Sequence, residues 1–128
     1  MIVDSSAFVA ILLQEPDADR LISTLEREPI IGVGSPILVE TCIVLSARLE
    51  RDMRGTVARM IQEFEIETIP FTDAHFGVAV SAWLRFGRGR HAANLNFGDC
   101  MSYAIARIAG RPLLCIGQDF PRTDLALA

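Results

Sequence analysis

The first fourteen residues, MIVDSSAFVAILLQ, decide the class of fold. Residues 1–3 form a short apolar run that ends at Asp4, and a pair of serines then leads into the apolar stretch AFVAILLQ at residues 7–14. A short apolar run closed by a polar turn is typical of a buried strand, and a longer apolar stretch is typical of a helix. The sequence therefore predicts a buried strand that leads directly into a helix.

The same alternation continues along the chain. We expect strands at residues 1–3, 30–33, 66–71 and 112–116, a marginal fifth strand at 125–127, and helices at 7–14, 17–28, 35–52, 56–65, 72–85 and 96–110. Short, continuously apolar strands that alternate with helices indicate a parallel sheet covered on both faces. The predicted fold is α/β, a three-layer α/β/α sandwich with a central parallel sheet of four to five strands.

Length and composition limit the possible functions. The chain has 128 residues, of which 51% are hydrophobic, enough for one core, and we expect a single domain over residues 1–128. Twelve basic and sixteen acidic residues give a net charge of −4, which argues against a simple basic clamp for nucleic acid. All twelve basic residues are arginines. P-loop ATPases and Schiff-base enzymes are excluded, because both depend on a lysine.

The three cysteines indicate a reducing compartment. Cys42, Cys100 and Cys115 are scattered through apolar stretches without a CxxC pair, a pattern of buried free thiols. A thiol enzyme built on Cys100 is disfavoured, because that residue falls inside a predicted helix without a nearby base. There is no signal-peptide pattern and no apolar stretch of about 18 residues. We therefore expect a soluble, cytoplasmic protein without a membrane segment.

Three aspartates are predicted to meet at one edge of the sheet. Asp4 directly follows the first strand, Asp119 follows the fourth by three residues, and Asp99 lies in the first turn of the preceding helix. Open parallel sheets bind ligands outside the carboxyl ends of their strands. Each aspartate alone could equally be a helix cap, since carboxylates favour helix starts.

Glu40 strengthens the case for a metal site. At helical spacing its neighbours are apolar, which places it on the apolar stripe of its predicted helix. An unpaired buried carboxylate costs on the order of several kcal/mol and is usually paired, protonated or bound to a metal. Beside three other acids we favour a hard cation, because Mg²⁺ or Mn²⁺ suits ligation by carboxylates alone.

Four segments together resemble a PIN-domain ribonuclease of the VapC toxin type over nearly the whole chain. They are IVDSSAFVAIL at residues 2–12, SPILVETCIVL at 35–45, GRGRHAANLNFGDCMSYAIA at 87–106 and RPLLCIGQDF at 111–120. The resemblance implies a homodimer that cleaves RNA with the help of magnesium and is held inactive by a cognate antitoxin. By match of motif, Asp4, Glu40 and Asp99 take the places of the first three acids, and Ser6 that of the hydroxyl.

The fourth acid departs from the commoner pattern, which resembles TxDxDF. This chain reads CIGQDF at residues 115–120, so Gly117 replaces the earlier acid and only Asp119 remains. Asp119 is then either a peripheral ligand acting through water or a structural cap, and the number of metal ions, one or two, stays open.

The predicted roles follow from the chemistry of phosphodiester hydrolysis. We expect Asp4 and Asp99 to bind the metal directly and Glu40 to orient the attacking water or to bind a second ion. Ser6 is expected to contact phosphate or metal-bound water. The alternative function is a non-catalytic binding module, in which the acidic pocket docks an arginine of a protein partner.

Two further surfaces are predicted to bind partners. Arg85, Arg88, Arg90 and His91 form the densest positive cluster of the chain and are expected to grip the RNA backbone, with a merely solvated loop as the alternative. The helices at 17–28 and 56–65, with the first helix, are expected to offer an apolar groove for the antitoxin tail.

Overall fold

Four short parallel strands form the centre of the molecule. The computed structural model describes residues 1–128. The strands are β1 (Ile2–Val3), β2 (Gly32–Gly34), β3 (Glu67–Ile69) and β4 (Leu113–Leu114), in the order β3-β2-β1-β4. The helices are α1 (Ser5–Leu12), α2 (Ala18–Arg27), α3 (Ser35–Leu49), α4 (Arg54–Glu63), α5 (Asp73–Phe86), α6 (Phe97–Ala109) and the short 3-10 helix η1 (Phe120–Arg122). The predicted α/β class is confirmed.

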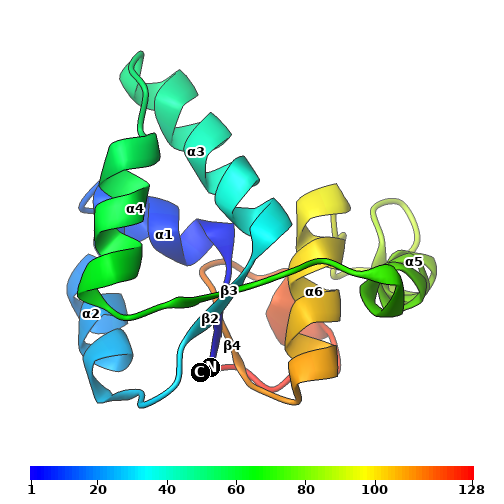
Figure 1. The fold of residues 1–128 in the computed structure, drawn as a ribbon. Coiled ribbons are helices and arrows are strands. Elements are labelled where there is room, and N and C mark those ends of the chain that lie inside the picture. Colours follow the sequence, from blue (N-terminus) through cyan, green and yellow to red (C-terminus); the bar gives the residue numbers. More distant parts are fainter.

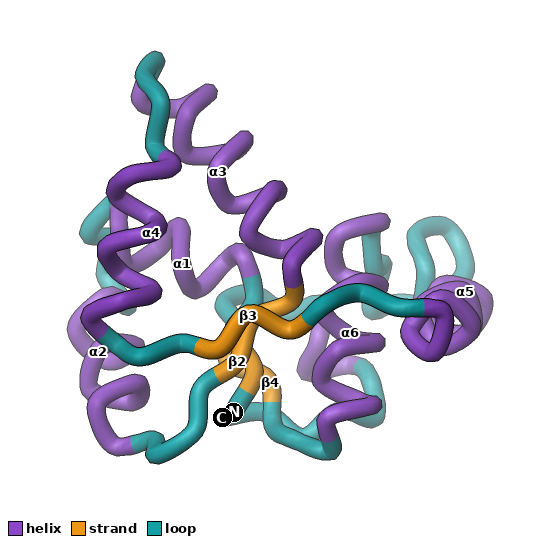
Figure 2. The backbone as a smooth tube through the Cα atoms, viewed as in Figure 1, coloured by secondary structure: helices purple, strands orange, loops and turns teal.

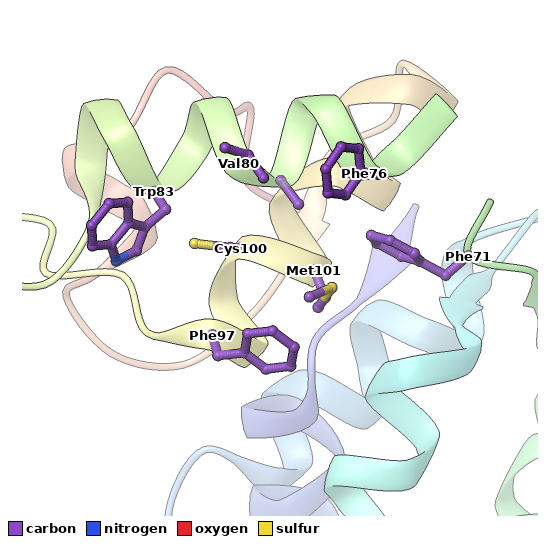
Figure 3. A pocket seen from close by; sticks show the side chains of 8 residues that line it. Phe71, Phe76, Val80, Trp83, Phe97, Cys100 and Met101 are labelled. Carbon is purple, nitrogen blue, oxygen red and sulfur yellow. The ribbon is translucent and has the colours of Figure 1, made fainter. Parts of the chain in front are cut away.

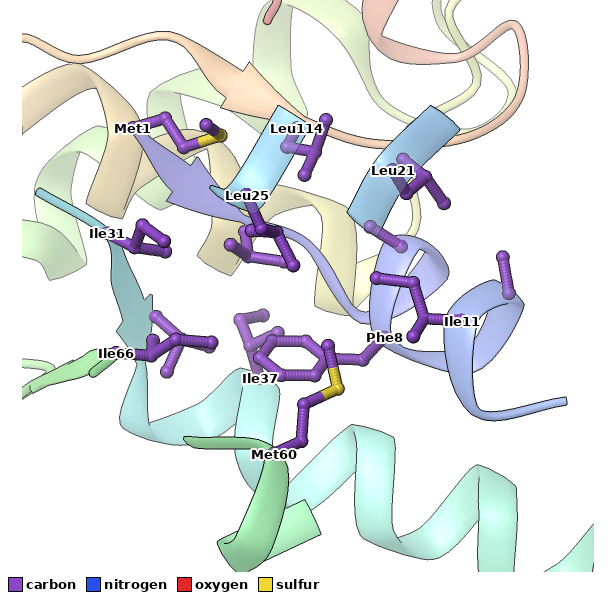
Figure 4. Packing of buried hydrophobic residues seen from close by; sticks show 14 residues of the cluster. Met1, Phe8, Ile11, Leu21, Leu25, Ile31, Ile37, Met60, Ile66 and Leu114 are labelled. Carbon is purple, nitrogen blue, oxygen red and sulfur yellow. The ribbon is translucent and has the colours of Figure 1, made fainter. Parts of the chain in front are cut away.

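The helices form two layers around this sheet. In Figures 1 and 2, α2 and α4 lie to one side of the strands and α5 and α6 to the other. Successive side chains of a strand point to opposite faces, and β1 shows the consequence. Val3 packs in a core with α1 to α4, whereas Ile2 packs in a second core with α5 and α6. Figure 4 shows the first core, where Phe8, Ile37 and Met60 meet. The three-layer sandwich is therefore confirmed.

Several element boundaries differ from the predictions for local reasons. Helix α1 starts at Ser5, because the Asp4 side chain caps it by accepting a hydrogen bond from the Ser6 amide. Strand β3 lies at the sheet edge with Glu67 and Thr68 exposed, so it is not covered as the other strands are. The expected fifth strand is reduced to one bridge between Leu113 and Leu127. None of the helices is long and apolar enough to cross a membrane.

Candidate active site

Asp4 lies at the carboxyl end of β1, at the centre of the candidate site. Its side chain is 2% exposed. Its Oδ2 atom accepts hydrogen bonds from the Ser6 amide at 3.0 Å and from the Ser6 hydroxyl at 2.6 Å. Its Oδ1 atom accepts a hydrogen bond from the Ser102 hydroxyl at 2.5 Å. Burial of this carboxylate is thus offset by hydrogen bonds rather than by a positive charge.

The Ser6 hydroxyl links the residues that follow β1 and β4. It donates to Asp4 and accepts a hydrogen bond from the Ile116 amide at 3.0 Å, just after β4. The sequence predicted a hydroxyl that contacts phosphate or metal-bound water. In the structure its proton is committed to Asp4, so Ser6 acts first by positioning that carboxylate.

Sequence reasoning missed Ser102. This residue is fully buried on the inner face of α6 and donates to Asp4 across a separation of 98 residues. The available signal was weak: a single hydroxyl, three residues after Asp99, in an otherwise apolar helix face. A serine at such a position commonly bonds to its own helix backbone, and nothing in the sequence identifies Asp4 as its partner.

Asp99 lies in the first turn of α6, where it takes part in capping the helix and also belongs to the candidate site. Its Oδ2 atom accepts a hydrogen bond from the Asn96 amide at 2.7 Å, and the Asn96 side chain accepts one from the Asp99 amide at 2.9 Å. Burial, together with the negative charges of Asp4, Asp119 and Glu40, raises the pKa of Asp99 to about 6 against the opposing Asn96 hydrogen bond. Asp99 therefore caps its helix, and the charges of the other three predicted acids act on it.

Glu40 extends from the second turn of α3 toward α6. The buried residues of α3 are Ile37, Thr41 and Leu45, whereas Val39 and Ile43 are 58% and 63% exposed. Glu40 does lie beside the apolar residues predicted for its stripe, since Pro36, Ile37, Ile43 and Val44 line the same groove, but Ile43 is exposed and Glu40 itself is only partly buried. Its carboxylate lies against Gly98, where a β-carbon would overlap both oxygens. Burial and, to a smaller degree, the charge of Asp4 raise the pKa of Glu40.

Asp119 completes the group at its rim. It is exposed at the start of η1 and its side chain makes no capping hydrogen bond. Gly117, two residues before Asp119, has φ +104°, a backbone conformation that favours glycine over any acid. The local backbone thus suits glycine at the position where the commoner pattern has its earlier carboxylate.

The charges of the site match a hard cation. No positively charged group shifts the pKa of Asp99 or Glu40, and the nearest such influence is that of Arg20 on the pKa of Cys115. The donor atoms are carboxylate and hydroxyl oxygens, which Mg²⁺ and Mn²⁺ prefer. No three of the acidic, histidine or cysteine side chains already stand in a metal-binding arrangement. Magnesium does not require such a cage, because it usually keeps several waters and binds through one or two carboxylates.

The residues of the predicted RNA-binding cluster differ in whether they already have a partner within the protein. Arg85 forms an ion pair with Asp124 at 3.1 Å, and Asp124 is also paired with Arg107. Arg85 therefore already has an acidic partner within the protein, in a pair that is exposed to solvent. By contrast, Arg88 is exposed without an ion pair.

The other two members of the predicted cluster contact their own loop. The Arg90 guanidinium lies 4.3 Å from the centre of the Trp83 ring. His91 accepts a hydrogen bond from the Ala93 amide and packs edge-on against Phe86. His91 therefore stabilises the loop, and Arg88 and Arg90 are the exposed cations that remain.

The helices predicted to hold an antitoxin tail show no large exposed apolar residue. On α2 and α4, Leu21, Leu25, Val57 and Met60 are buried. The large exposed hydrophobic residues lie elsewhere. These two helices therefore lack the exposed apolar side chains that the expected groove would need.

Exposed apolar side chains concentrate instead beside the acidic site. A pocket of about 390 Å³ between α5 and α6 has only hydrophobic residues in its lining, and Figure 3 shows Phe76, Trp83 and Phe97 around it. A second groove, along α3, shares Phe97 and Met101 with that pocket. The two form one continuous apolar surface that reaches from α5 across α6 to α3.

Comparisons with known proteins agree with this geometry. The sequence matches the PIN domain family over residues 1–125. Ribonuclease VapC36 of Mycobacterium tuberculosis is 42% identical over 130 residues, covering 98% of this chain and 91% of that protein. Ribonuclease VapC30 of the same species is 36% identical over 126 residues, covering 98% and 96%.

Solved structures show the same fold. The VapC20 toxin of M. tuberculosis, described as cleaving the sarcin-ricin loop, superposes with a TM-score of 0.79 at 18% identity and covers 99% of this chain and 97% of its own. A toxin-antitoxin complex from Klebsiella pneumoniae gives a TM-score of 0.73 at 12% identity, with 99% and 95% covered.

Proposed function

This chain belongs to the PIN-domain family, within its VapC ribonucleases, and on that premise we propose that it is a magnesium-dependent endoribonuclease, the toxin of a toxin-antitoxin pair. The whole chain, residues 1–128, would act as a single PIN domain. One observation carries the proposal: the carboxylate of Glu40 lies against Gly98, next to Asp99, and the charges of Asp4, Glu40 and Asp119 all help to raise the pKa of Asp99.

The proposed roles follow from these positions. A bound Mg²⁺, or Mn²⁺ in its place, supplies a water of lowered pKa and a counter-charge for the phosphate. Asp4 and Asp99 would hold the ion, and Glu40 would orient the attacking water or hold a second ion. Asp119, exposed at the rim, would contribute through water. Ser6 would act by keeping the Asp4 carboxylate in place.

RNA would be held beside the acids by the loop before α6. Arg88 and Arg90 remain for phosphate contacts, since Arg85 is paired with Asp124 and His91 is bonded within the loop. The acidic net charge of the chain means that such contacts must be local.

We assign the continuous apolar surface to a homodimer. It comprises six of the large exposed hydrophobic residues, on three helices: Val39, Ile43, Phe76, Val80, Trp83 and Phe97. Monomeric proteins rarely expose contiguous apolar surface of this kind. A second copy would bury the same surface of both subunits, as two-fold dimers do.

An antitoxin would be the other protein partner. Relatives of this chain are VapC toxins, and a structural neighbour is a toxin-antitoxin complex. The antitoxin surface is proposed to include the α1, α2 and α4 side of the molecule, through polar contacts and partly buried side chains such as Ile22 and Ile61. The three free cysteines suit the proposed cytoplasmic location.

The decisive experiment incubates metal-free protein with total RNA, with and without Mg²⁺ or Mn²⁺, and maps the ends of any cleaved RNA. We expect cleavage only when a metal is present, and none by Asp4→Asn protein purified in the same way. Cleavage that persists with EDTA, or with the Asp4→Asn protein, would contradict the proposal. Absence of cleavage together with absence of metal binding would favour the alternative, an acidic pocket that docks an arginine of a partner.

A further inference from the structure

The hydrogen bonds of Asp4 leave little of its carboxylate free. An ionised carboxylate offers about four acceptor sites over its two oxygens. Both contacts from Ser6, from its amide and its hydroxyl, reach Oδ2. The Ser102 hydroxyl takes one site on Oδ1. The remaining acceptor site is therefore on Oδ1, the oxygen that Ser102 holds.

We infer that Ser102 is a positioning residue of the metal site, which orients Oδ1 of Asp4 for the cation. This inference rests on the proposed function. Groups that hydrogen-bond to a metal ligand orient it and tune its affinity for the ion. Ser102 makes such a hydrogen bond to Asp4, and its side chain is fully buried.

The location of Ser102 on α6 supports a role in the site. Asp99 lies three residues earlier on the same helix, one turn away. Helix α6 thus presents one proposed ligand directly and holds another, Asp4, through Ser102. A shift of α6 would displace both carboxylates together, so the helix and β1 form a single frame for the ion.

The competing explanation is that Ser102 only fastens α6 to β1. Removal of a buried hydrogen bond lowers stability in either case, so stability alone does not separate the two. The neighbouring Tyr103 provides a matched control. It lies on the same helix and its hydroxyl donates to an aspartate, Asp124, at 2.6 Å, but this pair lies outside the acidic group.

The test measures the midpoint of thermal unfolding in EDTA and at increasing Mg²⁺ for the parent, Ser102→Ala and Tyr103→Phe. Ser102→Ala should need roughly 10- to 100-fold more Mg²⁺ for half-maximal stabilisation. Tyr103→Phe should unfold at a lower temperature in EDTA and keep the parental Mg²⁺ requirement. When RNA cleavage is measured at saturating Mg²⁺, the KM of Ser102→Ala should be close to that of the parent and its kcat should be lower.

A second variant covers the case in which Ser102→Ala does not fold. Ser102→Cys keeps the shape and replaces a strong donor by a weak one, and it should also raise the Mg²⁺ requirement. If either folded variant needs the same Mg²⁺ concentration as the parent for half-maximal stabilisation, the inference is overturned and the proposed function stands. A parent protein that gains no stability from Mg²⁺ and cuts no RNA would overturn the proposed function itself, and the inference with it.

Discussion

The carboxylate of Glu40 lies against the backbone of Gly98, in the first turn of α6, and occupies the space that any β-carbon at position 98 would take. Glu40 comes from α3, so the contact joins two helices on opposite faces of the sheet. Gly98 directly precedes Asp99. The absence of a side chain at this position therefore brings two of the proposed catalytic acids together.

The Gly98→Ala variant should lose RNA cleavage while remaining folded. The added methyl group would meet only the end of a flexible side chain, so Glu40 can rotate away at little cost, and the free energy of unfolding should change by less than about 1 kcal/mol. Displacement of a catalytic group by about 1 Å costs up to roughly 100-fold in rate. Single-turnover cleavage and thermal unfolding would check both parts.

Gly77→Ala is the matched control. Gly77 lies within α5, and a β-carbon added at this position would meet no neighbouring atom within 4 Å. Alanine is the better helix former by about 1 kcal/mol, so this variant should melt at a higher temperature and cut RNA at the parental rate. An unchanged rate in Gly98→Ala would show that the position of Glu40 does not matter for cleavage.

The sequence predicted the frame of the site well and its inner contacts poorly. Asp4, Asp99 and Asp119 were expected to meet because the carboxyl ends of parallel strands lie at one edge of a sheet, and the charges of Asp4 and Asp119 do act on Asp99. Ser102 was missed, since its partner Asp4 is 98 residues away. Hydroxyl partners depend on tertiary packing, which local patterns do not show.

Apolar patterning misled at α3 for a related reason. Its sequence contains two apolar faces, one buried through Ile37 and Leu45, the other exposed through Val39 and Ile43. Periodicity shows that apolar residues share a face but does not show what covers it. The ion pair of Arg85 was not foreseen for a similar reason, because its partner Asp124 lies 39 residues later in the chain.

RNA binding should depend on Arg88 and Arg90. The double variant Arg88→Gln/Arg90→Gln should weaken RNA binding and reduce the slope of log affinity against log salt by about 1.4, as expected for two lost contacts to single-stranded RNA. The Mg²⁺ requirement should not change. The exposed, unpaired Arg51 and Arg59 provide a matched control as Arg51→Gln/Arg59→Gln. Equal salt slopes in all three proteins would show that the loop is merely solvated.

Dimer formation should depend on Phe76, which is 67% exposed in the apolar pocket between α5 and α6. Loss of one buried aromatic contact of about 1.5–3 kcal/mol corresponds to a roughly 10- to 150-fold weaker dimer for Phe76→Ser. Sedimentation velocity over a range of concentrations measures this. Ile30→Ser, at a 52% exposed position outside that surface, is the control. A parent protein that stays monomeric at all concentrations would refute the assignment.

The last prediction concerns Asp99 and pH. Its pKa in the folded protein is raised from the ordinary 3.8 to about 6, first by burial, so the folded state holds this proton more tightly than the unfolded state. The stability that this provides is fully present below about pH 4 and is lost as the pH rises through 6. In EDTA at pH 7.5, Asp99→Asn should therefore be more stable than the parent by about 1–3 kcal/mol, reduced by solvent screening at this partly exposed group.

The same two proteins distinguish a metal site from a helix cap. The asparagine can still accept the hydrogen bond from the Asn96 amide that Asp99 accepts, and near pH 4 the two proteins should be equally stable. Saturating Mg²⁺ at pH 7.5 should stabilise the parent and leave Asp99→Asn unchanged. If Asp99 serves only as a cap, its loss should instead cost about 0.3–1 kcal/mol at neutral pH. Urea unfolding of both proteins, with EDTA or Mg²⁺, decides between these outcomes, because the two explanations predict stability changes of opposite sign.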